Sequence, residues 1–75
     1  TALSQVLLGK VLAARRRPAE AAPLLAAGVE ALRVDTAQPQ YVAYGLLALA
    51  EFHRTQGHPE RAEPLAREAT SRLAA

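Results

Sequence analysis

The chain has 75 residues, 51% of them hydrophobic, with a formal net charge of +2 and no cysteine. This length accommodates one small domain, because independent domains usually run to ~100–150 residues. The composition excludes disulfides, thiolate zinc sites and cysteine nucleophiles, and no apolar run approaches the ~20 residues that a membrane-spanning helix needs.

Two helices are expected in the first half of the chain, where alanine and leucine dominate. Apolar residues at three- and four-residue steps predict a helix over residues 2–16, with a broad apolar stripe formed by Val6, Leu7, Leu8, Val11, Leu12 and Ala14. This helix is expected to end in the cations Arg15, Arg16 and Arg17, whose positive charge offsets the negative end of the helix dipole. Pro18 suits the first turn of a second helix that runs to about Val34. Its inward residues are Ala21, Leu24, Leu25, Gly28 and Leu32.

The second half is expected to repeat this plan. Residues 34–39 contain turn formers and a proline, which predicts a break between helices. A third helix should run from about Gln40 to Gln56, ended by Gly57 in a position suited to a left-handed cap. A fourth should run from Pro59 to about Leu73.

An internal repeat of 41 residues underlies the two halves. This shift aligns residues 18–24 with residues 59–65, and it places Pro18 and Pro23 on Pro59 and Pro64. Chance matches are common in an alanine-rich chain, but they rarely reproduce two prolines at one spacing. The second proline of each pair removes a helical hydrogen bond and is expected to kink its helix. The repeat predicts an all-α fold of four helices, with two antiparallel hairpins stacked on each other.

Small and apolar residues recur at matching places in both copies. In the first copy they are Leu8, Gly9, Leu12, Ala21, Leu25 and Gly28. The equivalent positions of the second copy hold Leu49, Ala50, Ala62, Ala66 and Ala69, with His53 at the position of Leu12. This pattern resembles the tetratricopeptide repeat, and its long period is similar to the kinesin-light-chain type found in bacterial signalling and regulatory proteins. The resemblance implies a short right-handed solenoid over residues 1–75. Repeat one would cover about 1–34, the linker about 35–39 and repeat two about 40–75.

The resemblance also implies a binding surface. Tetratricopeptide arrays bind peptides or partner helices on a concave face lined by the first helix of each repeat. Carried over, that face would consist of Leu3, Val6, Lys10, Ala13, Tyr44, Leu47, Glu51 and Arg54. The charged residues would be polar contacts in an apolar groove, with Tyr44 as an amphipathic anchor; alternatively, they are solvated helix positions. The lysine and asparagine clamp of chaperone-tail binders is absent, since the chain has no asparagine.

The remaining polar clusters are interpreted as structural. Arg15–Arg17 could contact phosphate, but no aromatic is interleaved, so a solvated turn is favoured over nucleic-acid binding. His53 and His58 do not share the spacing of a helical metal pair, so no metal or other cofactor is expected. Neither has a serine and carboxylate arranged as a triad, so we expect no enzyme. Phe52 is assigned to the core, and Tyr41 is expected to staple the linker against the third helix.

Two functions remain open. The first is a non-catalytic protein-interaction module, cut from a larger scaffold, signalling or regulatory protein, that binds a peptide or partner helix. The alternative is a structural element that self-associates through the open end faces of its hairpins, because helical repeats usually need ~3 units and polar caps. Arginine-rich composition, with no methionine and no leader, leads us to expect a piece of a bacterial, cytoplasmic protein without a membrane partner.

Overall fold

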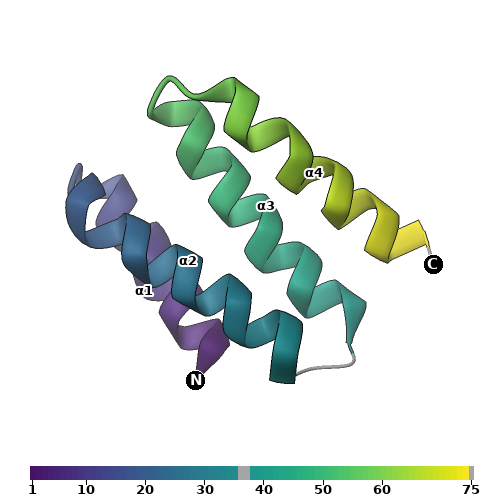
Figure 1. The fold of residues 1–75 in the computed structure, drawn as a ribbon. Coiled ribbons are helices and arrows are strands. Elements are labelled where there is room, and N and C mark those ends of the chain that lie inside the picture. Colours follow the sequence, from purple (N-terminus) through teal and green to yellow (C-terminus); the bar gives the residue numbers. More distant parts are fainter. Residues whose placement is uncertain (36–37, 75) are drawn as a thin grey trace.

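The computed structural model describes residues 1–35 and 38–74, and this part of the chain is built from helices. They are α1 (Ala2–Ala14), α2 (Pro18–Asp35), α3 (Pro39–Thr55) and α4 (Pro59–Ala74). In Figure 1, α3 lies between α2 and α4, and α1 lies behind α2. Successive helices run antiparallel, so α1–α2 and α3–α4 form two stacked hairpins. The predicted all-α architecture is confirmed.

The helix boundaries fall within two residues of those expected. The largest difference is at α1, which ends at Ala14 rather than Arg16. The expected linker over 35–39 is shorter, because Asp35 is still helical and Pro39 occupies the first turn of α3, where its missing N–H is not needed. Its central residues, 36 and 37, lie outside the described residues. Both α2 and α4 continue through their internal prolines without a break.

The turns that end α1 and α3 share one backbone arrangement. Arg16 has φ +60° and Gly57 has φ +81°, both in the left-handed region. The following N–H groups then reach back to the helix: Arg17 N donates to the Leu12 carbonyl at 2.9 Å, and His58 N donates to the His53 carbonyl at 2.8 Å. This is the Schellman pattern of helix ends. Under the repeat, Arg16 therefore occupies the position of Gly57.

Each hairpin brings its two helices together through a small residue. A Cβ added to Gly9 of α1 would lie only 2.7 Å from Cγ of Leu25 on α2. The repeat equivalents of these two residues are Ala50 and Ala66. The first hairpin thus pairs a glycine with a leucine, whereas the second has two alanines at the same positions.

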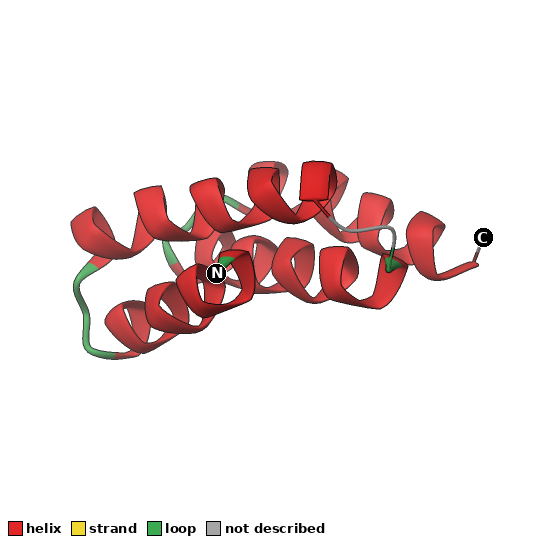
Figure 2. Cartoon of the chain, turned by 90° about the horizontal axis from the view of Figure 1, so that it is seen from below, coloured by secondary structure: helices red, strands yellow, loops and turns green. Residues whose placement is uncertain are grey.

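The core lies where the hairpins meet, and α3 packs against each of the other helices. Its main buried residues are Val6, Ala21, Leu25, Val29, Leu32, Val42, Ala43, Leu46, Ala48, Phe52 and Ala69. Val6 sits at the junction, because Cβ atoms built on Gly28 of α2 and Gly45 of α3 would lie 2.7 and 3.7 Å from its Cγ2. The fold is a slab of 34 × 27 × 14 Å, with the helices in two layers (Figure 2). The assignment of Phe52 to the core is confirmed.

Candidate functional site

An apolar groove runs between α1 and α3, with a volume of about 360 Å³. It is lined by Lys10, Ala13, Ala14, Leu25, Tyr44, Leu47, Ala48, Glu51, Phe52 and Thr55. Residues spaced three and four apart share one face of a helix, so the regular spacing along α3 presents one continuous wall. The opposite wall carries two alanines of α1, and the core residues Leu25 and Phe52 lie beneath the groove, only 0% and 7% exposed.

Five of the residues expected on the binding face line this groove. They are Lys10, Ala13, Tyr44, Leu47 and Glu51. Leu3 lines a second pocket, with Leu7, Gln40, Tyr41 and Tyr44. Arg54 does not line the groove, but it contacts the groove residue Glu51, with Nη2 and Oε2 3.7 Å apart.

Val6 requires a correction. It was expected on the binding face, but it has no exposed surface. The reason is that α3 packs over it, at the junction with Gly28 and Gly45 described above. The equivalent residue of the second copy, Leu47, has no helix over it and is 47% exposed.

The rim of the groove carries two charged residues, Lys10 and Glu51. Lys10 Nζ donates to the Tyr44 hydroxyl at 3.2 Å and lies 4.8 Å from the centre of its ring, a cation–π distance. Among the described residues, no carboxylate lies within ion-pair distance of Lys10, whereas Glu51 is paired with Arg54. The groove therefore offers an apolar floor beside one uncompensated cation.

Some groove residues were not expected from the sequence. Ala48 and Thr55 each lie four residues beyond an expected groove residue of α3, so extending the helical spacing would have found them. Leu25 and Phe52 had been assigned to the core. They border the groove from beneath while remaining buried, and only the packed structure shows this.

Tyr41 lines the second pocket and is 44% exposed. Its expected role in stapling the linker concerns residues 36 and 37, which lie outside the described residues. Because Tyr44 belongs to both pockets, the groove and the second pocket adjoin each other along α1 and α3.

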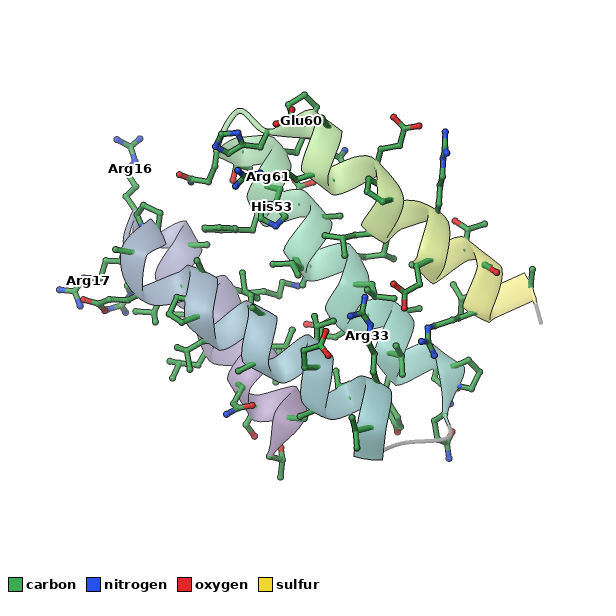
Figure 3. The ribbon with its side chains drawn as sticks, in the orientation of Figure 1. Arg16, Arg17, Arg33, His53, Glu60 and Arg61 are labelled. Carbon is green, nitrogen blue, oxygen red and sulfur yellow. The ribbon has the colours of Figure 1, made fainter. Side chains whose placement is uncertain are left out.

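The two histidines lie near the turn between α3 and α4. His53 contacts the ring of Phe52 edge-on, with centroids 5.8 Å apart. Burial lowers the pKa of His53 below its ordinary value, and the nearby charge of Arg61 lowers it further (Figure 3). His58 Nδ1 lies 3.4 Å from Glu60 Oε1. Among residues 1–35 and 38–74, no three metal-ligating side chains cluster in a way that could hold an ion.

The arginine turn at the end of α1 extends into solvent. Arg16 and Arg17 project away from the helices (Figure 3), and Arg17 Nη1 lies 3.6 Å from Glu20 Oε2. Within the described part of the chain, no helix combines the length and hydropathy required to cross a bilayer.

Comparisons of the chain with protein-family models, with curated proteins and with solved structures give no match. The tetratricopeptide resemblance therefore stands as a hypothesis based on the internal repeat and its small residues.

Proposed function

We propose that this chain is a non-catalytic protein-interaction module of the tetratricopeptide type, which binds a peptide or partner helix in the groove between α1 and α3. The observation that supports this most directly is the composition of the groove, an apolar floor with Lys10 held beside it by Tyr44. In this proposal the parent is a bacterial, cytoplasmic scaffold, signalling or regulatory protein.

The shape of the site favours a chain segment over a compact small molecule. The groove and the second pocket are adjacent apolar sites that share Tyr44, and both are bordered by α1 and α3. Two neighbouring pockets suit successive side chains of an extended segment, or side chains one turn apart on a helix. The partner would place an apolar side chain against Ala13, Ala14 and Leu47, above the buried Leu25 and Phe52.

The charges favour a partner with an acidic residue beside that apolar anchor. Lys10 lacks a carboxylate partner among the described residues, while Glu51 already has Arg54. A carboxylate next to the anchor would therefore meet an available cation.

The experiment is a peptide-display selection on the wild-type chain, followed by anisotropy titrations of the selected peptides. Ala14→Leu adds bulk inside the groove, and Ala26→Leu makes the same change at an exposed position of α2 that lines neither pocket. We expect the peptides to bind the wild type and Ala26→Leu alike, and to bind Ala14→Leu at least ~10-fold more weakly, a loss of about 1.4 kcal/mol.

A second comparison tests the charge. Lys10→Glu should weaken the binding of peptides with an acidic residue beside the anchor and leave the circular dichroism spectrum unchanged. The proposal fails if the selection returns no peptide, or if the selected peptides bind Ala14→Leu as tightly as the wild type.

A further inference from the structure

Large apolar side chains are exposed on both ends of the two-hairpin stack. At the α1 end, Leu7 and Val11 are 48% and 50% exposed. On the second hairpin, Leu47 of α3, which also lines the groove, is 47% exposed, and Leu73 of α4 is 56% exposed. Such residues normally lie in the core, so an exposed group of them marks a surface that another element covers.

The α1 end has a buried counterpart within the same molecule. We call Ser4, Leu7 and Val11 the leading face; their repeat equivalents are Gly45, Ala48 and Phe52 of α3. All three equivalents are buried where α3 meets the first hairpin. The leading face therefore corresponds to a surface that, one repeat later, is covered by the preceding hairpin.

The other end shows the same relationship in reverse. We call Leu47, Thr70 and Leu73 the trailing face; their repeat equivalents are Val6, Val29 and Leu32. These equivalents are 0%, 1% and 6% exposed. A Cβ on Gly45 would lie 2.9 Å from Leu32 Cδ1 and 3.4 Å from Val29 Cγ2, so α3 of the following hairpin is the element that covers them.

We infer that the leading face of one copy of this chain binds the trailing face of a second copy, head to tail. The contact between the copies would resemble the contact between the two hairpins of a single chain. It differs where Ser4 replaces Gly45, because a Cβ at that position would lie 2.9 Å from the equivalent leucine within a chain, so the helices must lie slightly further apart there. Its two surfaces are different, so each copy keeps one free face of each kind after pairing. Such a heterologous contact adds copies without closing and yields open stacks.

The polar residues of both faces can be buried without loss. Thr70 Oγ1 donates to the Ala66 carbonyl of its own helix at 3.0 Å. The Ser4 hydroxyl lies 2.9 Å from the Thr1 hydroxyl, in hydrogen-bond contact. Covering either face would therefore leave no hydroxyl without a partner, which is the usual penalty for burying a polar group.

The contact between copies would lack the ion pair that joins the hairpins within a chain. That pair links Arg33 to Glu68, and the repeat equivalents are Ala74 and Ala27. Neither attraction nor repulsion between charges is built into this part of the contact. Added salt should therefore not weaken the association.

Sedimentation velocity over a wide concentration range tests the inference. The wild type should grow from monomer to larger stacks as its concentration rises, with or without added salt. Leu7→Glu blocks the leading face and Leu73→Glu blocks the trailing face, so each variant alone should need at least a ~10-fold higher concentration to associate. An equimolar mixture of the two variants still contains one intact face of each kind and should form a one-to-one dimer.

The matched control is Ala19→Glu, which adds the same charge at an exposed first-turn position whose repeat equivalent is Glu60. This control should associate like the wild type, and circular dichroism should show every variant to be folded. The inference fails if the wild type stays monomeric at all concentrations, if only one of the two faces matters, or if the mixed variants do not pair. None of these outcomes depends on peptide binding in the groove.

Discussion

The guanidinium of Arg33 on α2 and the carboxylate of Glu68 on α4 form a two-point ion pair that ties one hairpin to the other. Arg33 Nη2 lies 2.6 Å from Glu68 Oε1, and its Nε donates to Oε2 at 3.1 Å. Arg72 also donates to Oε2, at 3.0 Å. Both partners of the inter-hairpin pair are about 30% exposed, at 29% and 31%, so solvent screens the pair only in part.

A double-mutant cycle measures this pair. Arg33→Met and Glu68→Gln should show a coupling free energy of about 1 kcal/mol, because a two-point, half-buried contact exceeds ordinary surface pairs. The reference is the exposed pair Arg67–Glu63 within α4, for which we expect about 0.3–0.5 kcal/mol. The measurement is urea unfolding of the four proteins of each cycle. Equal coupling in the two cycles would contradict the prediction.

Stability should fall at acidic pH through Glu68. The hydrogen bond from Arg33 is the main cause that lowers the pKa of this carboxyl below its ordinary value of 4.5; partial burial opposes the shift, and the hydrogen bond from Arg72 adds a smaller lowering effect. The unfolded chain then binds the proton more readily, so the contribution of Glu68 is present above pH 4.5 and is lost as the pH falls below it.

The check is urea unfolding from neutral pH down through 4.5. Glu68→Gln should lose stability less steeply than the wild type over this range. Arg33→Met should behave in the same direction, because it removes the largest cause of the shift. If the stability of Arg33→Met fell with pH as steeply as that of the wild type, the pH dependence would belong to other carboxyls.

Replacing Arg16 by glycine should stabilise the chain. Arg16 holds φ +60° at the position where the second hairpin has Gly57. A side chain in this region costs about 1–2 kcal/mol, which the added flexibility of glycine in the unfolded state offsets in part. We expect a gain of about 0.5–1 kcal/mol, or a rise in Tm of ~2–8 °C for a domain of this size. The control is Arg15→Gly. Because Arg15 has φ −88°, glycine relieves no backbone strain there, and this change should destabilise the chain.

Gly28→Ala should destabilise the fold more than Gly45→Ala does. A Cβ at Gly28 would lie 2.7 Å from Val6 Cγ2 and 3.1 Å from the backbone oxygen of Ala2, and neither can move without shifting α1. At Gly45 the nearest atom is the flexible end of Leu32, at 2.9 Å. We expect losses of about 1–3 kcal/mol at Gly28 and under about 1 kcal/mol at Gly45. Thermal unfolding of both variants measures these losses of stability. Equal losses would contradict the prediction, because they would mean that α1 shifts as easily as the Leu32 side chain.

The sequence predicted those parts of the fold that depend on neighbours along the chain. Helical periodicity located all four helices, and Gly57 was identified as a left-handed cap, which its φ of +81° confirms. The left-handed Arg16 was not expected, although the repeat already placed it on Gly57. Its conformation follows from the same helix-ending hydrogen bonds rather than from its residue type.

Contacts between the two hairpins could not be predicted from the periodicity of the sequence. The stripe predicted on α1 was too broad, because Leu7 and Val11 are exposed and only Val6 among its members is fully buried. Periodicity defines an apolar face but does not say which side of it a neighbouring helix covers. The pair Arg33–Glu68 joins residues 35 positions apart, a separation at which no local pattern operates.

The unlike small residues of the two hairpins also affect misassembly. If α1 paired with α4, Gly9 would face Ala66 and leave a void. If α3 took the place of α1 beside α2, the methyl group of Ala50 would face Leu25. The native partner of Leu25 is Gly9, where a Cβ would lie only 2.7 Å from Leu25 Cγ. Both exchanged pairings are penalised, one by lost contacts and the other by overlap. The residues at which the two helices of a hairpin meet therefore differ in size between the repeats, and this difference favours the native pairing over an exchanged one.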